Sequence, residues 1–491
     1  MAIGYIIGSA DTQGATVFLV DEARVGQYVV LESKEEPVIG LITSVVSDSP
    51  IFDDRMADSD MVKEMGEKKI QIPSFMKAKV KLICKLNSMT QPDLPPLAGT
   101  PVRLATNEEL ERIFANDGDI EVGSLIGKDV RVRIRGNALM RHLAILASTG
   151  SGKSNTVAVL SSRIAEKNGS VLVFDYHGEY YDSDIKKLNN VEAKMNPLYL
   201  TPSEFAMLLD IRDNAVIQYR VLRKAFKEFI SDVERGMREG GTADLGKLDE
   251  TFFSKLTEKV EEVAKKENRK KSVDEVLNKI EDFVDRFSDI ISFTVGDVTQ
   301  RVRRGMVNVV NLSSLDEEGI DAIVSHYLRR VLTARKEYKT RKKEGLKHPI
   351  VLVIEEAHVL LSKDENTLTK RWAGRIAREG RKFGVGLVVV SQRPKGIDEN
   401  ILSQMINKII LKMVEPTDKR YVLEASDNLS EDIIDSLSSF APGEALIVGN
   451  IVRVPAVVKI DKFEGKLGGS EPSLFEEEEK DDYSDVLNWG I

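Results

Sequence analysis

The sequence contains a single cysteine, Cys84, among its 491 residues. One thiol cannot form an internal disulfide, and it cannot build a zinc site by itself. No apolar run approaches the roughly 20 residues that a transmembrane helix needs. Residues 1–5 lack the basic and hydrophobic segments of a signal peptide. These absences predict a cytoplasmic protein without a structural metal.

An excess of positive charge is also absent, because 79 Asp and Glu residues outnumber 70 Lys and Arg residues and give a formal net charge of −9 at pH 7. Much of the excess lies after Pro472, where residues 476–482 are almost a block of carboxylates. A protein that grips DNA through a few residues in a pore needs local positive charge, not a basic surface throughout. The net charge therefore does not exclude a nucleic-acid partner.

The first hundred residues alternate short β-type runs with Gly, Asp, Ser and Pro turns. The runs lie at residues 5–7, 15–20, 28–31, 38–42 and 80–84. Several short strands at close spacing predict a small β-barrel, which we place at residues 1–104. Thr106 and Glu109 then have the spacing of a capping box for a short helix around residues 110–114.

From about residue 129 onward, strand-type runs alternate with helical segments. Near-continuous apolar runs occur at residues 143–147, 171–174, 306–310, 349–354 and 386–390. Runs of this kind are typical of parallel strands that are covered on both faces. We therefore expect an α/β, doubly wound motor domain in two parts, residues 105–200 and 301–460. Runs at residues 444–449 and 451–458 flank a Gly-Asn turn and predict a terminal hairpin.

Between about residues 202 and 293 the strand pattern disappears. Segments 252–263 and 273–287 show helical spacing with many Lys and Glu residues. We expect an inserted helical bundle at residues 201–300 and, at the other end of the motor, an acidic tail at residues 461–491. A charged, solvated helix pair that acts only as a spacer is an equal alternative for the insertion.

The stretch at residues 143–155 has the layout of a phosphate-binding loop. An apolar strand enters a Gly/Ser/Thr turn, and a helical sequence that begins with Gly-Lys-Ser leaves it. Backbone N–H groups and the helix dipole favour a phosphate there, while Lys153 reaches its oxygens and Ser154 binds Mg²⁺. Ala147 replaces the usual first glycine. The predicted nucleotide contacts are Ser148, Thr149, Gly150, Ser151, Gly152, Lys153, Ser154 and Asn155. The alternative is a chance Gly-Lys-Ser at a surface turn.

A second strand, at residues 350–354, ends in two carboxylates, Glu355 and Glu356. A carboxylate at the tip of such a strand can hold Mg²⁺ through water, opposite the phosphate loop. We assign this role to Glu355, and we expect Glu356 to orient and deprotonate the attacking water. The alternative is a structural strand followed by the polar start of a helix. That alternative explains one glutamate at this position, but two in succession would then be a coincidence. The two motifs together predict a site that hydrolyses ATP with Mg²⁺ as cofactor.

Further polar residues follow neighbouring strands. Gln392 comes directly after the strand at residues 386–390 and is placed to sense the γ-phosphate or the attacking water. Arg381 is our preferred arginine for clasping the phosphate of an adjoining subunit, and Arg141 is the alternative. Surface ion pairs explain any single arginine equally well.

Asp175 ends the strand at residues 171–174, so we expect it to support the magnesium network. His177 and His358 have no partner pattern for metal binding. We interpret both as structural hydrogen-bonding residues.

Together these features resemble the HerA branch of the FtsK–HerA superfamily of hexameric DNA pumps. The matching stretches are Ala-Ser-Thr-Gly-Ser-Gly-Lys-Ser-Asn, Asp-Tyr-His-Gly-Glu-Tyr, Ile-Glu-Glu-Ala-His and Ser-Gln-Arg-Pro, in that order. The barrel and the helical insertion also match, so the resemblance covers nearly the whole chain. It implies a RecA-like motor that threads DNA through a hexameric ring. It also implies work with a NurA-type nuclease on DNA ends during recombinational repair.

The resemblance does not say which basic residues grip the DNA. The candidates are Lys186, Lys187, Lys363 and Lys370, and no spacing argument selects among them. A DNA-pumping ring without strand separation and a protein-remodelling ring ATPase are alternatives with the same motor fold. A nucleotide-switched scaffold is a third, against which Glu356 argues, because a pure binder needs no water-activating carboxylate.

Overall fold

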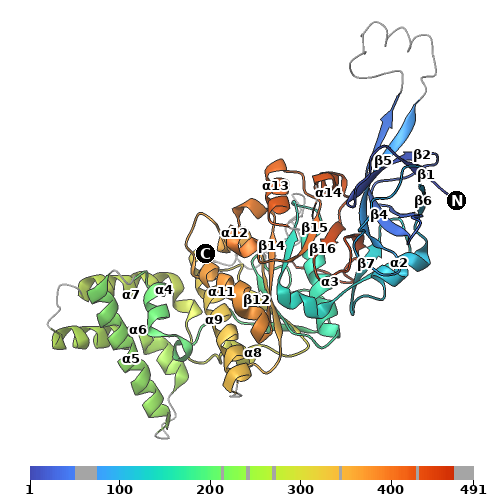
Figure 1. Ribbon diagram of the computed structural model, residues 1–491. Helices are drawn as coiled ribbons and strands as arrows, with labels where there is room; N and C mark the ends of the chain where they lie inside the picture. Colours follow the sequence, from blue (N-terminus) through green and yellow to red (C-terminus); the bar gives the residue numbers. More distant parts are fainter. Residues whose placement is uncertain are drawn as a thin grey trace, which may run out of the picture.

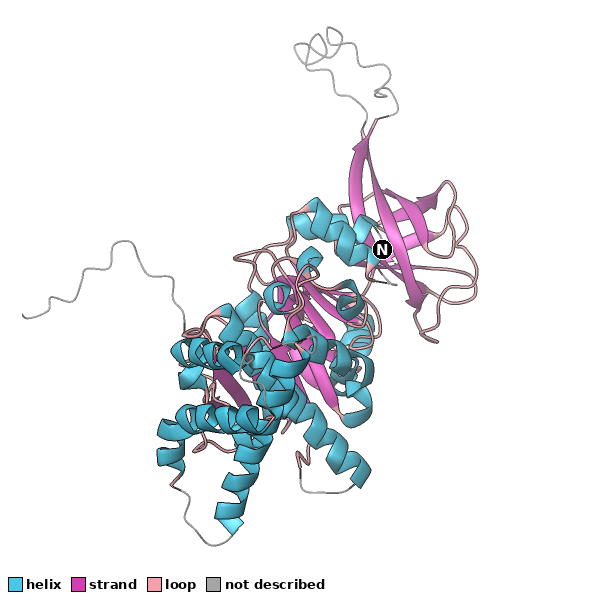
Figure 2. Cartoon of the chain, turned by 90° about the vertical axis from the view of Figure 1, so that its left-hand side faces the viewer, coloured by secondary structure: helices cyan, strands magenta, loops and turns pink. Residues whose placement is uncertain are grey.

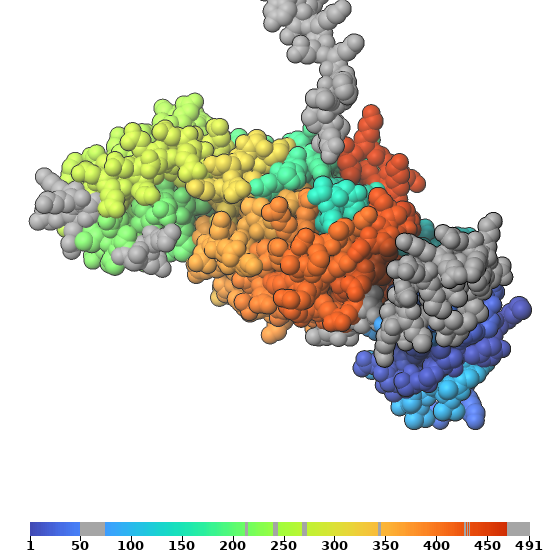
Figure 3. Space-filling view, turned by 90° about the horizontal axis from the view of Figure 1, so that it is seen from above, coloured from blue at the N-terminus to red at the C-terminus, as the bar shows by residue number. Residues whose placement is uncertain are grey.

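The computed structural model describes residues 1–49, 74–211, 215–238, 244–267, 273–341, 345–426, 429 and 431–468. A barrel, an α/β motor and a helical insertion follow one another in space, with the barrel and the insertion at opposite ends (Figures 1 and 3). The acidic run at residues 476–482 lies outside the described residues. Within the described parts of the chain, every helix is too short or too polar to span a lipid bilayer.

The N-terminal barrel is closed and has six strands among the described residues. Its strands, in spatial order, are β1 (Gly4–Ile7), β2 (Gly14–Leu19), β5 (Phe75–Lys85), β4 (Val38–Asp48), β3 (Tyr28–Leu31) and β6 (Pro101–Leu104), and β6 pairs again with β1. Alternate residues such as Val17 and Leu19 fill the interior. Closure pairs every strand, so no open edge is left. The predicted barrel is confirmed.

The helix α2 (Asn107–Phe114) connects the barrel to the motor. Thr106 and Glu109 form the predicted capping box, in which each side chain bonds to the other residue's backbone. The chain then forms β7 (Ile120–Leu125) and β8 (Arg131–Ile134), which join the far edge of the motor sheet.

The described part of the motor is built on one sheet of eleven strands. Its parallel part, in spatial order, is β11 (Leu188–Val191), β12 (Val307–Asn311), β10 (Val171–Asp175), β13 (Ile350–Ile354), β14 (Val385–Ser391), β9 (Leu143–Leu146) and β15 (Asn407–Leu411). Every residue of β9, β10, β13 and β14 is buried, because helices cover both faces of the sheet (Figure 2). The predicted doubly wound α/β motor is confirmed.

Two main helices lie on opposite faces of this sheet. The connections β9–α3–β10 and β13–α11–β14 run in opposite directions across the sheet, so right-handed crossovers place α3 (Lys153–Glu166) and α11 (Leu368–Phe383) on different faces. The long helix α9 (Glu317–Arg341) packs against α11. Shorter helices complete the motor: α8 (Val298–Arg301), α10 (Ala357–Leu360), α12 (Glu399–Leu402), α13 (Pro416–Glu424) and α14 (Glu431–Ser436), with 3-10 turns η1 (Gly136–Arg141), η2 (Pro197–Tyr199), η4 (Ser288–Ile290), η5 (Pro394–Gly396) and η6 (Leu437–Ser439).

The insertion is helical, as its sequence pattern predicts. Its described helices are α4 (Pro202–Leu208), α5 (Val216–Arg238), α6 (Leu245–Lys266) and α7 (Val273–Phe287). They share an aromatic core in which Phe205 stacks on Phe226, with ring centroids 4.4 Å apart, while Phe252 packs edge-on against Phe205. The charged residues of these helices cover the outside, and the insertion leaves the motor between β11 and β12.

The terminal hairpin differs from its prediction in the second strand. The strands β16 (Glu444–Val448) and β17 (Ala456–Ile460) are antiparallel, but residues 449–455 form a longer connection. The Ile451 N–H donates to Oδ1 of Asn407, and its carbonyl accepts from the N–H of Arg135. These bonds hold residue 451 against β15 and β8, so it cannot pair with β16.

Candidate nucleotide-hydrolysis site

The loops that carry the predicted motifs meet at one edge of the sheet. The strands β10, β13, β14 and β9 are adjacent and parallel, so their carboxyl ends lie together. Asp175 ends β10, Glu355 and Glu356 follow β13, Gln392 follows β14, and the phosphate loop follows β9. The carboxyl edge is where open α/β sheets bind ligands.

Glycine conformations and hydrogen bonds within the chain hold the phosphate loop in shape. Gly150 and Gly152 have φ values of 72° and 99°, a left-handed conformation that glycine adopts without strain. The Ser151 hydroxyl donates to the Ser148 carbonyl at 2.5 Å, and the Ser151 carbonyl accepts from the Gly443 N–H at 2.8 Å. The short turn between η6 and β16, which contains Gly443, therefore supports the phosphate loop through this hydrogen bond.

Lys153, the first residue of α3, contacts the tip of β13. Its ammonium group donates to Oε1 of Glu356 in a largely buried ion pair. Gln392 donates to the same oxygen at 3.1 Å and accepts from the Thr149 hydroxyl at 2.5 Å. The structure thus joins phosphate-loop lysine, second carboxylate and strand-end glutamine in one network, as expected of a hydrolytic site.

Glu356 has an unusual environment. Its φ of 41° is left-handed, which is strained for a residue with a side chain and is common at functional sites. Burial raises the pKa of Glu356, but the hydrogen bond and charge of Lys153 outweigh it, and the net shift is downward. Glu356 is therefore a carboxylate at neutral pH, the form that accepts a proton from water.

Two histidines stand beside this carboxylate. Nδ1 of His358 lies 3.3 Å from Oε2 of Glu356 and 3.3 Å from the Ser391 hydroxyl. Nε2 of the half-exposed His177 lies 3.7 Å from Oε1 of Glu356. His358 thus makes the hydrogen bond that the sequence predicts, and both rings also contact the proposed base.

Glu355 is more deeply buried and lacks a basic partner in hydrogen-bonding distance among the described residues. Its Oε1 accepts from the Tyr180 hydroxyl at 2.7 Å, and its buried Oε2 has no hydrogen-bond partner. Burial, with the nearby charge of Asp175, raises the pKa of Glu355 to about 8. A cation bound at Oε2 would give this oxygen a partner and would favour the ionised form of the Glu355 carboxyl group.

Asp175 supports the site indirectly. Its carboxylate accepts the N–H groups of Glu179, Tyr180 and Tyr181 at 2.9, 2.9 and 3.0 Å. Burial raises the pKa of Asp175, and these bonds oppose that shift. The residue closes the loop after β10, which brings Tyr180 to Glu355.

The residues at this edge fit a magnesium ion bound together with nucleotide phosphates. The Ser154 hydroxyl makes no hydrogen bond with a described residue, and Oε2 of Glu355 has no partner. No group of three or more His, Cys, Asp or Glu side chains in the described ranges is arranged to hold a metal by itself. Mg²⁺ commonly takes one or two protein ligands and completes its shell with phosphate oxygens and water.

The chain is similar to known proteins along its whole length. Family models described as "Helicase HerA, central domain", "HAS barrel domain" and "Helicase HerA-like C-terminal" match residues 120–331, 3–89 and 293–460. The DNA double-strand break repair helicase HerA of Sulfurisphaera tokodaii is 64% identical, with 100% of both chains covered. The protein of the same name from Sulfolobus acidocaldarius is 60% identical over 100% of both chains. The chain belongs to the HerA helicase family. The resemblance found in its motifs is confirmed.

A solved structure of low sequence identity shares the fold of the motor. VirB4 of Thermoanaerobacter pseudethanolicus superposes with a TM-score of 0.51 at 18% identity, covering 72% of this chain and 98% of that one. At this identity the likeness concerns the fold alone, and it agrees with the α/β motor described above.

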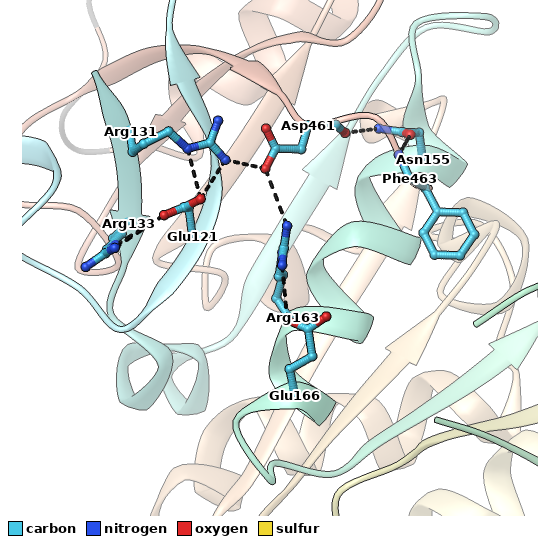
Figure 4. A network of polar contacts seen from close by, with 8 residues as sticks. All are labelled: Glu121, Arg131, Arg133, Asn155, Arg163, Glu166, Asp461 and Phe463. Atoms are coloured by element: carbon cyan, nitrogen blue, oxygen red, sulfur yellow. Dashed lines mark hydrogen bonds and ion pairs between the residues drawn. The ribbon is translucent and has the colours of Figure 1, made fainter. Parts of the chain in front are cut away.

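Asn155, the third residue of α3, is bound to the chain that follows β17. Its amide donates to the Asp461 carbonyl at 2.8 Å and accepts from the Phe463 N–H at 2.8 Å (Figure 4). The Asp461 carboxylate lies between Arg131, at 2.5 Å, and Arg163, at 3.8 Å. We call residues 461–468 the strap. The side-chain amide of Asn155 is therefore already hydrogen-bonded to the strap. If Asn155 contacts the nucleotide, as predicted, the contact is made by its backbone N–H group.

The two candidate arginines of this HerA chain lie away from its own phosphate loop. Arg141 ends η1, just before β9, and Arg381 lies in the last turn of α11, just before β14. Both are therefore at the amino edge of the sheet. Neither side chain forms an ion pair or hydrogen bond with the described residues, and Arg381 is exposed.

The four candidate lysines differ in their surroundings. Lys187 donates to the Ala165 carbonyl at 3.0 Å, and Lys370 donates to the Ser362 carbonyl at 2.8 Å. Lys186 and Lys363 are exposed. All four remain predictions as DNA contacts.

Two parts of the site carry no sequence signal that reasoning from local patterns could use. Tyr180 lies in a matched stretch, but nothing in its spacing from Glu355, which is 175 residues away, says that their side chains meet. Gly443 supports a loop that precedes it by about 290 residues, as its bond to Ser151 shows. Only the sheet order brings these pairs together.

Proposed function

We propose that this chain is an ATP-dependent DNA helicase or translocase that threads DNA through a hexameric ring. In this proposal it supports DNA end processing in recombinational double-strand-break repair, together with a NurA-type nuclease. One observation carries the enzymatic part: Lys153, Glu356 and Gln392 form a single network at the ends of adjacent strands. The full-length relatives named as DNA double-strand break repair helicases support the DNA substrate.

In the proposed reaction each residue has one task. Backbone N–H groups of residues 148–155 and the ammonium group of Lys153 bind the phosphates of ATP. Ser154 and Glu355 hold Mg²⁺, which offsets the charge on the β- and γ-phosphate oxygens when it is bound. Glu356 takes a proton from the attacking water, and Gln392 orients that water.

The ring, the nuclease and the compartment are further parts of the proposal. A ring would bring an arginine of a neighbouring chain, Arg381 or Arg141, to the γ-phosphate, where it would offset the developing charge. The partner nuclease follows from the family resemblance, because a motor that feeds DNA ends needs an enzyme to trim them. We infer that the protein works in the cytoplasm, where its DNA substrate is.

The test is steady-state ATP hydrolysis with and without double-stranded DNA, at low and moderate salt. We expect DNA to stimulate hydrolysis and salt to weaken the stimulation, because contacts with phosphates release counterions. Lys153→Ala, which removes the phosphate contact, should be inactive in all conditions. Robust hydrolysis that ignores DNA would instead favour a protein-remodelling ATPase.

A further inference from the structure

Tyr180 is a fully buried side chain whose hydroxyl contacts Glu355. Its exposed fraction is 1%, and its hydroxyl donates to Oε1 of Glu355 at 2.7 Å. A tyrosine hydroxyl is protonated at neutral pH, so it acts as the donor in this bond. The second oxygen of Glu355 is left buried without a partner.

The loop that carries Tyr180 is fixed from two sides. On the inner side, Asp175 accepts three successive backbone N–H groups of residues 179–181. On the outer side, the strap is bonded to the loop: the Gly468 N–H donates to the Glu179 carbonyl at 2.7 Å. The Lys466 N–H also donates to the Asp184 carboxylate at 2.8 Å.

These bonds determine how Glu355 can turn. A glutamate side chain in a cavity has several rotamers, and one directed hydrogen bond selects among them. With Oε1 held by Tyr180, the free oxygen is the one that remains for a cation. Residues that orient a metal ligand through a hydrogen bond typically change metal affinity or activity by about 10–100-fold when they are removed.

We propose that Tyr180 is a positioning residue of the metal site, which holds one oxygen of Glu355 so that the other binds Mg²⁺ or its water. This inference rests on the proposed function, because it assumes the metal that ATP hydrolysis uses. It adds a residue that contacts neither nucleotide nor metal. A tyrosine that only filled the core would do so equally well without its hydroxyl.

The test compares Tyr180→Phe, which keeps the ring and loses the hydroxyl, with Tyr181→Phe as the matched control. The Tyr181 side chain is only partly buried, and its hydroxyl makes no hydrogen bond with the described residues. Binding of Mn²⁺ to the ADP-saturated protein is measured by electron paramagnetic resonance, which does not depend on turnover. We expect affinity for Mn²⁺ to fall about 10-fold or more in Tyr180→Phe and to stay unchanged in the control.

Two further readouts separate positioning from packing. Affinity for ADP without metal should be the same in both variants, and high Mg²⁺ should restore much of the hydrolysis lost in Tyr180→Phe. Unchanged Mn²⁺ affinity in Tyr180→Phe would overturn the inference. If Tyr180→Phe does not fold, Asp175→Asn replaces it, because it loosens the same loop and should also weaken Mn²⁺ binding. Failure of the proposed function shows separately, as wild-type hydrolysis that ignores DNA.

Discussion

Lys153 and Glu356 neutralise each other at the carboxyl edge of the sheet. Their side chains are 11% and 6% exposed, and an unpaired charge at such burial is strongly unfavourable. A phosphate that binds Lys153 competes with Glu356 for the same ammonium group, so nucleotide binding and the environment of Glu356 are coupled.

Replacing Glu356 by glutamine tests this division of roles. We expect Glu356→Gln to bind ATP at least as tightly as the wild type, because no ion pair between Lys153 and a carboxylate has to be broken when the phosphates bind. Turnover should fall by about 10²–10⁴-fold, because the proton acceptor is gone. Fluorescent-nucleotide binding and steady-state hydrolysis measure the two effects, with the exposed Glu365→Gln as control. Undiminished hydrolysis would remove Glu356 from the role of base.

We expect His142 to make the stability of the motor sensitive to acid. It is 3% exposed, and its Nδ1 accepts from the Leu387 N–H at 3.0 Å. Burial lowers its pKa from 6.5 to about 4, although a hydrogen bond to the Ala377 backbone opposes this shift. The unfolded chain therefore binds more protons than the folded chain between pH 6.5 and about 4, so stability is lost as the pH falls through this window.

The variant His142→Gln removes this titration. Between pH 7 and pH 4, we expect the wild type to lose at most about 3 kcal/mol more than the variant in free energy of unfolding. Denaturant unfolding at several pH values measures the difference. His177→Gln, at a half-exposed position, should behave like the wild type. Parallel curves for wild type and His142→Gln would contradict the prediction.

Among the elements, the strap connects parts of the site that are distant in sequence. It holds α3 through Asn155 and the Tyr180 loop through Glu179 and Asp184. The phosphate-binding helix and the loop that positions Glu355 thus share one support. A displacement of the strap would therefore change the hydrogen bonds of both the helix and the loop.

Two truncations isolate the contribution of the strap. A chain that ends at Gly468 keeps the strap, whereas a chain that ends at Ile460 loses it. We expect the shorter chain to melt about 3 °C or more below the longer one, since several hydrogen bonds of roughly 1 kcal/mol each are lost. Its affinity for ADP should also fall, because α3 loses a support. Calorimetry and nucleotide titration measure both, and equal values for the two chains would show that the strap supports nothing.

The sequence predicts elements well where burial is uniform. The runs that became β10, β13 and β14 are apolar on both faces, and this pattern admits few structures other than a covered parallel strand. The pattern also predicts that the motifs after these strands lie close together, because the carboxyl ends of parallel strands lie at the same edge of a sheet. The second hairpin strand was placed wrongly, since a distant residue, Asn407, holds Ile451. The strap and the Tyr180–Glu355 bond were missed for the same reason.

On the scale of the whole molecule, the two candidate arginines cannot serve their own nucleotide. β14 has 7 residues and spans about 20 Å, and Arg381 precedes its start while Gln392 follows its end. Arg141 precedes β9 in the same way. An arginine at the amino edge reaches a phosphate only if another molecule presents its carboxyl edge to it. If either arginine acts on a nucleotide, that nucleotide is therefore bound to another chain, as in the proposed ring.

Mixing two inactive variants tests action between subunits. Arg381→Ala should bind ATP normally but turn it over about 10³-fold more slowly, because the charge that develops in the transition state is not offset. Lys153→Ala should fail to bind the phosphates yet keep its arginine. When the two are mixed and allowed to exchange subunits, an intact Lys153 site can face an intact Arg381, so hydrolysis should return.

The control mixture replaces Arg381→Ala by a chain that carries both Lys153→Ala and Arg381→Ala, and it should stay inactive. An arginine acting within its own chain predicts no recovery in either mixture. The same experiment with Arg141→Ala then decides which arginine crosses the interface.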